Sequence, residues 1–447
     1  MKTRVLAPIA LAIALAGCQS DNASQVQTPI AAEQNIMKEN PFFSDFTTPY
    51  GIPPFEKIKK SHYLPAFEHG IKLNRAEIQA IANNNAAPTF ENTIEAMEKA
   101  GDFLNTVENV FFGLTGSMSD TEMRAIEKEI SPKLSALSDD ISLNPALFAR
   151  VKEVYQQRDK LNLRADQKTL LETTYKGFIR GGANLNEADK ASFRQLNEKI
   201  SALSLKFGEN LLHETNSFEM VIDNKADLAG LPEDIIAAAA VTATERGHDG
   251  KWVFTTHRPS KNPFLTYSTN RKLRETIYKG YTERGNNNDA YDNKNIASEL
   301  ASLRYQRASL LGYKTHAHFV LENATAKTPE NVFKLLDKVW PAALKQAKAE
   351  AADMQKMIDA EGGNFKLAAW DWWYYAEKIR KARYDLDAAA TKPYFSLEAT
   401  LKGVFYTAEK LWGVTFKERN DLPKYHEDVR TFEMYDKDGS YVGIFMT

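Results

Sequence analysis

The sequence predicts a mostly α-helical protein with a few short strands. Apolar residues recur at spacings of three and four along much of the chain, which is the pattern of a helix with one buried face. Glycine and proline are scarce, with 22 and 17 residues among 447, so long helices meet few interruptions. Hydrophobic residues make up 43% and charged residues 26%, as in globular proteins. We therefore expect one continuous helical body after residue 40.

Local signals predict where individual helices begin and end. Thr328-Pro329 is a start signal, because proline in the first turn of a helix loses no hydrogen bond. Leu335 and Val339 then lie on one apolar face. Ser268 is expected to cap a helix start, and Gly312 is expected to end a helix. The predicted helices are 88–107, 195–212, 268–281, 296–310, 328–360, 370–385 and 397–411.

Few segments have the pattern of a strand. Residues 218–223 and 252–257 are expected to be short strands. Residues 429–435 and 440–447 are predicted to pair as a β-hairpin, because an Asp-Gly turn separates them. The order Asp-x-Asp-Gly also begins an EF-hand loop, but the remaining ligands and the closing Glu are missing. The turn interpretation is therefore preferred.

The first 17 residues predict a signal peptide. Lys2 and Arg4 form a positive start, and an apolar run over 5–16 follows. That run is shorter than the about 20 residues that a membrane span requires. It ends in Leu-Ala-Gly-Cys, which resembles a lipobox, with cleavage after Gly17 and a diacylglyceride on Cys18. The alternative is a plain secretory signal followed by a chance cysteine.

Cys18 is the only cysteine in the sequence, so the body has no disulfide and no catalytic thiol. An acylated Cys18 predicts a partner, the lipid bilayer, and a location on the periplasmic side of a bacterial membrane. The following Gln19 and Ser20, in place of an Asp, favour the outer membrane by resemblance. Residues 18–39 are expected to be a flexible tether and residues 40–447 the helical region.

Charge argues against a nucleic-acid partner, and hydropathy argues against a membrane-spanning helix after the signal. The net charge is −2, and it becomes −4 when Lys2 and Arg4 leave with the signal. A nucleic-acid-binding protein would need a basic surface, so no nucleic-acid partner is expected. No later segment has 18 unbroken apolar residues, as a membrane-spanning helix would.

The end of the sequence is unusual. The predicted final strand, 441–447, is apolar, and a lone two-stranded hairpin is marginally stable in water. Its outer edge would offer unpaired N–H and C=O groups to other chains. We expect a truncation in the middle of a sheet; the alternative is a natural end whose edge is covered by a helix.

No catalytic or metal-binding residue is predicted in this chain. A zinc hydrolase on a helical fold would present His-Glu-x-x-His, which places two imidazoles on one helix face. His213 and His426 are each followed by Glu, but neither motif has the second His. His316 and His318 are two residues apart and would point in different directions on a helix. The eight histidines are therefore interpreted as surface or packed residues.

Residues 370–375 form the densest aromatic stretch, Trp-Asp-Trp-Trp-Tyr-Tyr. Such side chains could line a peptide channel, but packing between helices with hydrogen-bonded polar tips is the preferred interpretation. Glu377 and Lys381 are expected to form a surface pair four residues apart on a helix.

Several stretches, in order from about residue 40 to the end, together resemble one family, the M3 zinc metallopeptidases, on its peptidyl-dipeptidase and oligopeptidase A branch. These stretches are Pro54-Phe55-Glu56-Lys57-Ile58, His62-Tyr63-Leu64-Pro65-Ala66-Phe67, Pro88-Thr89-Phe90-Glu91-Asn92-Thr93-Ile94, Pro263-Phe264-Leu265-Thr266-Tyr267-Ser268, Leu310-Leu311-Gly312-Tyr313, Trp370-Asp371, Tyr374-Tyr375-Ala376-Glu377-Lys378, Tyr394-Phe395, Gly403-Val404-Phe405 and Gly443-Ile444-Phe445.

The resemblance implies a mostly helical, neurolysin-like fold split by a deep channel, and zinc-dependent cleavage of oligopeptides into C-terminal dipeptides. It also implies that the His-Glu-x-x-His helix, a further Glu ligand and substrate-binding Tyr and His follow the Gly-Ile-Phe strand. This sequence ends on that strand, so no family site residue is carried onto it. Zinc is expected for the family and is not expected on this chain.

Three hypotheses follow. The first is a truncated M3 metallopeptidase that is inactive alone. The second is a non-catalytic lipoprotein that retains the helical lobe as a peptide-binding or scaffold module. The third is a split enzyme whose C-terminal catalytic part is a separately encoded partner.

Overall fold

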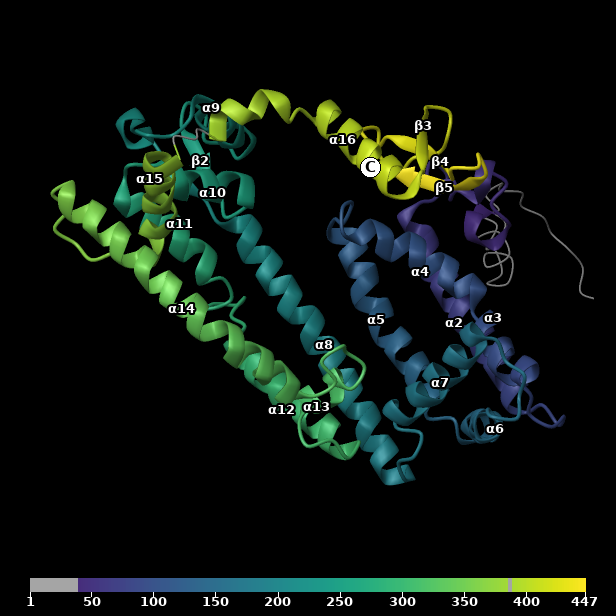
Figure 1. Ribbon diagram of the computed structural model, residues 1–447. Coiled ribbons are helices and arrows are strands. Elements are labelled where there is room, and N and C mark those ends of the chain that lie inside the picture. Colours follow the sequence, from purple (N-terminus) through teal and green to yellow (C-terminus); the bar gives the residue numbers. More distant parts are fainter. Residues whose placement is uncertain (1–38, 385–387) are drawn as a thin grey trace, which may run out of the picture.

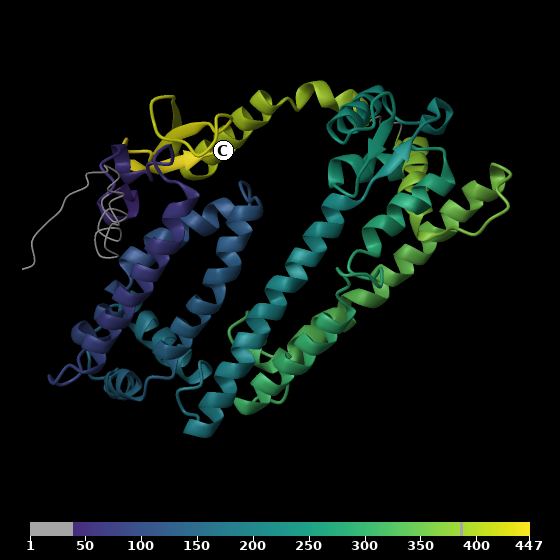
Figure 2. The ribbon, with the colours of Figure 1, turned by 180° about the vertical axis from the view of Figure 1, so that it is seen from behind.

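The computed structural model describes residues 39–384 and 388–447. The predicted signal peptide, with Gly17 and Cys18, lies outside the described residues, and so does almost all of the tether. Helices dominate and the strands are short, so the predicted mostly α fold is confirmed. Figure 1 shows the helices of the N-terminal part on one side, two long helices on the other, and the last residues above both. The view from behind in Figure 2 shows the same arrangement.

The N-terminal part has two apolar cores. In the first, Phe67 and Phe111 are fully buried and meet edge to face, with ring centroids 5.4 Å apart. In the second, Leu147 and Leu171 are fully buried. The elements of this part are η1 (Pro41–Phe43), η2 (Pro49–Gly51), η3 (Lys60–His62), α2 (Tyr63–Ala82), η4 (Phe90–Glu95), α3 (Ala96–Lys99), α4 (Asp102–Thr115), α5 (Thr121–Ser142), α6 (Pro145–Gln156) and α7 (Ala165–Arg180).

A long helix, α8 (Glu187–Ser217), leads from the N-terminal part to the second half of the chain (Figure 1). It contains the predicted helix 195–212. A small third core lies beyond it, around an antiparallel pair of strands with Met220 opposite Phe254. The elements of this half are β1 (Met220–Ile222), η5 (Lys225–Leu228), α9 (Glu233–Glu245), β2 (Trp252–Phe254), α10 (Arg258–Tyr267), α11 (Arg271–Thr282), α12 (Lys294–Leu310), α13 (His316–Leu321), α14 (Pro329–Ala360), η6 (Ala369–Asp371) and α15 (Trp372–Tyr384).

The last described elements form a helix and a three-stranded antiparallel sheet in the order β3-β4-β5. The predicted hairpin is confirmed: Phe432 is opposite Phe445, and Gly439 has φ +82° in the turn. The sequence did not predict the third strand, β3. The elements are η7 (Ala388–Tyr394), α16 (Leu397–Trp412), β3 (Thr415–Arg419), β4 (Thr431–Tyr435) and β5 (Tyr441–Met446).

This sheet contacts the start of the described chain. The rings of Tyr50 and Tyr441 stack with centroids 4.8 Å apart, and the Tyr50 hydroxyl donates to the buried carboxylate of Glu433. Phe55 meets Tyr425 edge to face. The first and last described segments are thereby held together, as Figure 1 shows.

Several large apolar side chains remain exposed on α14 and α16. On α14, Leu335 and Trp340 are each 63% exposed, although the predicted helix and its apolar face are both present. We call the exposed residues the apolar face of α14, and it comprises Phe333, Leu335, Leu336, Val339, Trp340 and Leu344. The face lacks a covering element among the described residues. No helix in that part of the chain is long and apolar enough to cross a membrane.

Three local predictions were wrong. The predicted helix 88–107 is broken at Gly101, which has φ +90° and donates its N–H to Glu77. Ser268 follows the end of α10, and Asn270 caps α11 by accepting the N–H of Leu273. Glu377 pairs with Arg380 at 2.6 Å, and not with the predicted Lys381.

Candidate functional site

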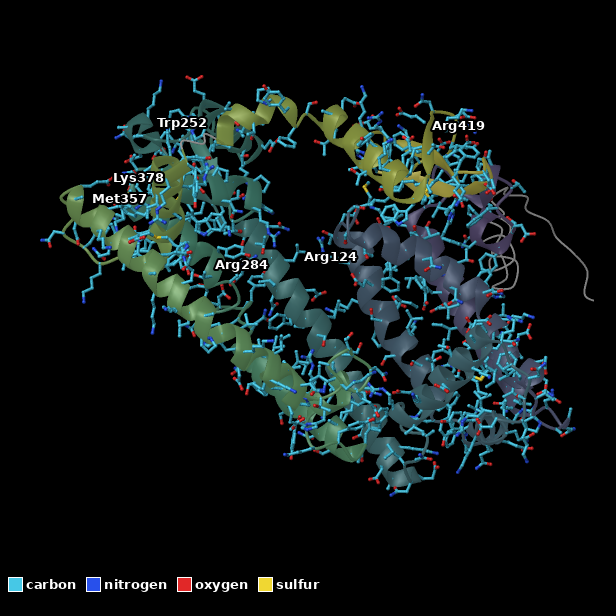
Figure 3. The ribbon with its side chains drawn as sticks, viewed as in Figure 1. Arg124, Trp252, Arg284, Met357, Lys378 and Arg419 are labelled. Carbon is cyan, nitrogen blue, oxygen red and sulfur yellow. The ribbon has the colours of Figure 1, made fainter. Side chains whose placement is uncertain are left out.

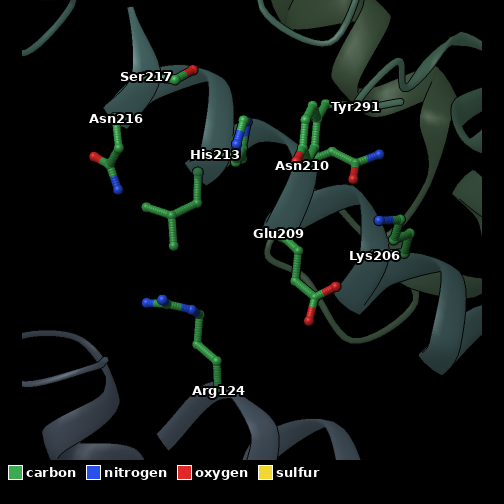
Figure 4. Close-up of a pocket in the computed structure, with 9 residues that line it drawn as sticks. Arg124, Lys206, Glu209, Asn210, His213, Asn216, Ser217 and Tyr291 are labelled. Carbon is green, nitrogen blue, oxygen red and sulfur yellow. The ribbon is translucent and has the colours of Figure 1, made fainter. Parts of the chain in front are cut away.

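A pocket of about 480 Å³ lies between α5 and α8. Figure 4 shows Arg124 reaching from α5 toward the residues of α8, and Figure 3 labels Arg124 in the whole molecule. The volume lies in the range of small-ligand sites, about 300–1,000 Å³. The lining residues are Arg124, Lys206, Glu209, Asn210, Leu212, His213, Asn216, Ser217 and Tyr291.

The two helices are tied together away from the pocket. Asn197 of α8 donates to Asp139 of α5 at 2.7 Å, and Arg194 pairs with Asp140 at 2.8 Å. Burial raises the pKa of Asp139, because a buried carboxylate loses contact with water. A hydrogen-bond donor beside it stabilises the charged form. Arg124 lies in the first turns of α5, toward the opposite end of that helix. These two contacts hold α5 and α8 together at one end. The pocket lies toward the other end of α5.

The charges around the pocket are mixed. Arg124 and Lys206 are cationic, and Glu209 is the acidic residue of the lining. Burial, together with the charge of Glu209, raises the pKa of Glu127 on α5. The pocket thus combines positively charged hydrogen-bond donors with a carboxylate that accepts hydrogen bonds.

One wall of the pocket is flat. The ring of His213 stacks on that of Tyr291 with centroids 3.5 Å apart and an interplanar angle of 9°. Leu212 adds an exposed apolar side chain beside them. Polar groups with an apolar wall are the usual composition of a small-ligand site.

The histidines do not form a metal site. His318 lies 3.6 Å from Glu330, and His426 lies 3.6 Å from Asp428, in different parts of the molecule. Across residues 39–384 and 388–447, three or more His, Cys, Asp or Glu side chains nowhere gather closely enough to hold a metal ion. The described residues therefore do not fit a catalytic zinc ion.

The aromatic stretch 370–375 is used mainly for packing. Tyr375 is buried, and Trp372 and Tyr374 pack in the same cluster with Met354 and Ile358 of α14. Trp373 is the exposed member. The packing interpretation therefore describes this stretch better than a channel lining does.

The sequence did not predict the pocket. Arg124 and His213 are far apart in the chain, and they belong to no motif. His213 is an exposed residue packed on Tyr291, as the sequence predicts for a surface or packed histidine, and it also lies in the lining of the pocket. Only the packing of α5 against α8 brings these side chains together.

Comparisons with known proteins identify the kind of protein. Residues 264–446 match the model of peptidase family M3. Dipeptidyl carboxypeptidase of Escherichia coli K12 is 40% identical over 407 residues, which are 91% of this chain and 60% of that protein. Oligopeptidase A of Salmonella typhimurium is 28% identical over 402 residues, which are 89% of this chain and 59% of that protein. Saccharolysin of Saccharomyces cerevisiae is 25% identical over 366 residues.

These similarities define the family of the chain. The chain belongs to the M3 family, on the branch that includes dipeptidyl carboxypeptidase and oligopeptidase A. M3 peptidases are zinc metallopeptidases, so zinc is the cofactor of the family. The chain spans about 60% of the length of the dipeptidyl carboxypeptidases that it matches.

Proposed function

We propose that this chain is the helical, peptide-binding part of a zinc-dependent peptidyl-dipeptidase, which removes dipeptides from the C-termini of oligopeptides. The observation that carries this proposal is the 40% identity with dipeptidyl carboxypeptidase over 91% of the chain. The pocket between α5 and α8 supports a role in peptide binding, because it offers charged groups, hydrogen-bonding groups and a flat aromatic wall.

The zinc ligands, in this proposal, lie on polypeptide that corresponds to the part of the relatives beyond the aligned 60%. That polypeptide packs on the apolar face of α14 and on the exposed apolar residues of α16. Large exposed apolar patches of this kind mark contacts with other protein segments. This chain alone is then expected neither to retain stoichiometric zinc nor to hydrolyse peptides.

A complementation experiment tests the proposal. The chain without residues 1–17 is mixed with the portion of Escherichia coli dipeptidyl carboxypeptidase that the alignment leaves uncovered. We expect release of C-terminal dipeptides from an oligopeptide, inhibited by a chelator and restored by zinc, only when both parts are present. Metal analysis of each purified part shows where the zinc is held.

Two results would contradict the proposal. One is chelator-sensitive dipeptide release by the chain alone. The other is a stable complex of the two parts that contains zinc but hydrolyses no peptide; the non-catalytic binding function would then be preferred.

We also propose that the protein is exported and held at the periplasmic side of the membrane through acylated Cys18, outside the described residues. The charged start, the apolar run and the Leu-Ala-Gly-Cys sequence support this. Oligopeptides in that compartment would be its substrates or ligands.

A further inference from the structure

We infer that the pocket between α5 and α8 binds the free C-terminal carboxylate of a peptide, with Arg124 as the residue that recognises the carboxylate. This inference rests on the proposed function and deepens it. An enzyme that removes residues from the C-terminus must distinguish a chain end from the interior of a chain, and the carboxylate is what marks that end.

Arg124 has unused hydrogen-bonding capacity. Its guanidinium carries five N–H donors, and among residues 39–384 and 388–447 its one hydrogen bond joins Nη2 to the hydroxyl of Thr121, 3.2 Å away on the same helix. No acidic side chain of the described chain lies within 4 Å of it. By contrast, Arg75 of α2 and Arg194 of α8 both pair with Asp140 at 2.8 Å. Arg124 is therefore free to form the paired, parallel hydrogen bonds that guanidinium makes with a carboxylate.

The neighbours of Arg124 suit the rest of a peptide end. Lys206, on the facing helix, is exposed and adds a second positive charge for the carboxylate. Glu209 and Asn216 can accept the N–H groups of the last peptide bonds, since a peptide presents donors beside its terminal carboxylate. The stacked rings of His213 and Tyr291 give a flat surface for the side chains of the ligand.

The helices that carry these groups are held together at one end. The hydrogen bonds from Asn197 to Asp139 and from Arg194 to Asp140 hold α5 against α8 at the end away from Arg124. The pocket lies at the other end, between Arg124 of α5 and residues of α8.

Binding of paired peptides tests the inference. The probe is the peptide Gly-Ala-Ala-Phe with an N-terminal fluorophore, once with a free C-terminus and once as the C-terminal amide, titrated against the full chain without residues 1–17. We expect the free acid to bind about tenfold tighter or more, because a hydrogen bond to a charged group is stronger than one to a neutral group. Arg124→Gln should reduce the affinity for the acid to that for the amide, and Arg124→Lys should restore part of the preference.

A matched control is Arg164→Gln, which removes the same charge from an exposed arginine paired locally with Asp166. It should leave the preference for the acid unchanged. The circular dichroism melting curve of each variant shows that it is folded. Lys206→Gln supplies an independent change on the facing helix and should lower the affinity for the acid more than that for the amide.

The outcomes separate this inference from the proposed function. Equal binding of acid and amide by the unaltered chain, or a preference that survives Arg124→Gln, would overturn the carboxylate site while peptide binding stands. If neither peptide binds, both the site and the peptide-binding role of this chain are wrong. A preference that both Arg124→Gln and Arg164→Gln abolish would show general charge attraction, and would also overturn the assignment to Arg124.

Discussion

At the scale of single residues, Asp371 organises the contact between α11 and the segment before α15. Its carboxylate is fully buried and accepts hydrogen bonds from Arg271 and Arg274, each with a closest distance of 2.9 Å. It also accepts the backbone N–H of Ala368. The guanidinium of Arg274 lies 4.2 Å from the ring centre of Tyr374. The negative charge of buried Asp371 is thus balanced by two arginines, and its oxygens also accept a backbone N–H.

Asp371→Asn is expected to lower the free energy of unfolding by about 3 kcal/mol, because it leaves a buried arginine without its counter-charge. Urea unfolding followed by circular dichroism measures this. The control Asp166→Asn removes the acid of an exposed pair and should change stability by about 0.5 kcal/mol or less. Equal effects of the two variants would contradict the role of Asp371.

Glu127 has a pKa raised first by burial and further by the charge of Glu209. An acid with a raised pKa binds its proton more tightly in the folded state than in the unfolded state. Its contribution to stability is therefore complete below the ordinary glutamate pKa of 4.5 and is lost as the pH rises through the raised value.

Glu127→Gln removes this pH dependence. As the pH rises from about 4 to about 7, we expect the free energy of unfolding of the variant to increase by a few tenths of a kcal/mol relative to that of the unaltered chain. The value is small because the side chain is partly exposed to solvent. Urea unfolding at both pH values tests this, with the exposed Glu172→Gln on α7 as the control. A stability difference that does not change with pH would show that the Glu127 carboxyl is unperturbed.

At the scale of elements, α14 is a long amphipathic helix whose two ends have different surroundings. Near its C-terminal end, Met354 and Ile358 are buried against α15. Over its first turns, the apolar face of α14 is exposed. Exposed side chains contribute little to the stability of the chain that carries them, since they are as accessible as in the unfolded state.

Replacing Leu335 and Trp340 by Gln should therefore change the free energy of unfolding of this chain by about 0.5 kcal/mol or less. Ile358→Ala, on the same helix, should cost about 2–5 kcal/mol because it leaves a cavity in a packed core. In the complementation experiment the double Gln variant should lose most of the restored activity. Full activity in that variant would show that another surface binds the second part.

Helix boundaries depended on contacts that the local pattern does not contain. The break before α4 occurs at Gly101, where a side chain would approach the amide of Asn74 to 2.7 Å. Asn270 caps α11 because its side-chain oxygen accepts the N–H of Leu273, whereas Ser268 ends α10 and its hydroxyl accepts the N–H of Asn270. The sequence pattern did not predict strand β3, which is defined by its pairing with β4, with Phe416 opposite Met434.

At the scale of the whole molecule, the last described strands contact the first described segment. The stack of Tyr50 on Tyr441 holds the sheet to the N-terminal segment, and Lys392 pairs with Asp234 at 2.5 Å near α9. The last described segment, from η7 to β5, is thus held by contacts near both of its ends with parts of the chain that are distant in sequence. The outer strand β5 has one hydrogen-bonded neighbour among the described strands.

The proposed membrane anchor also concerns the whole molecule. Cys18→Ser should move the protein from the membrane fraction to the soluble periplasmic fraction, because the acyl chains supply the binding free energy. Incorporation of labelled palmitate into the unaltered protein, and its loss in the variant, checks this. Ser20→Ala is the control and should remain in the membrane fraction. Membrane association of the unlabelled Cys18→Ser protein would contradict the anchor.

The sequence by itself determined the helical class, most helix positions and the final hairpin, because these follow from the spacing of apolar residues and from turn residues close together in the chain. It also determined the family, through ordered short stretches. Only the tertiary structure decided which charges pair and where a pocket forms. Asp371 acquired its two arginines, and Arg124 acquired the wall of α8, by packing between distant segments, and no local pattern records such packing.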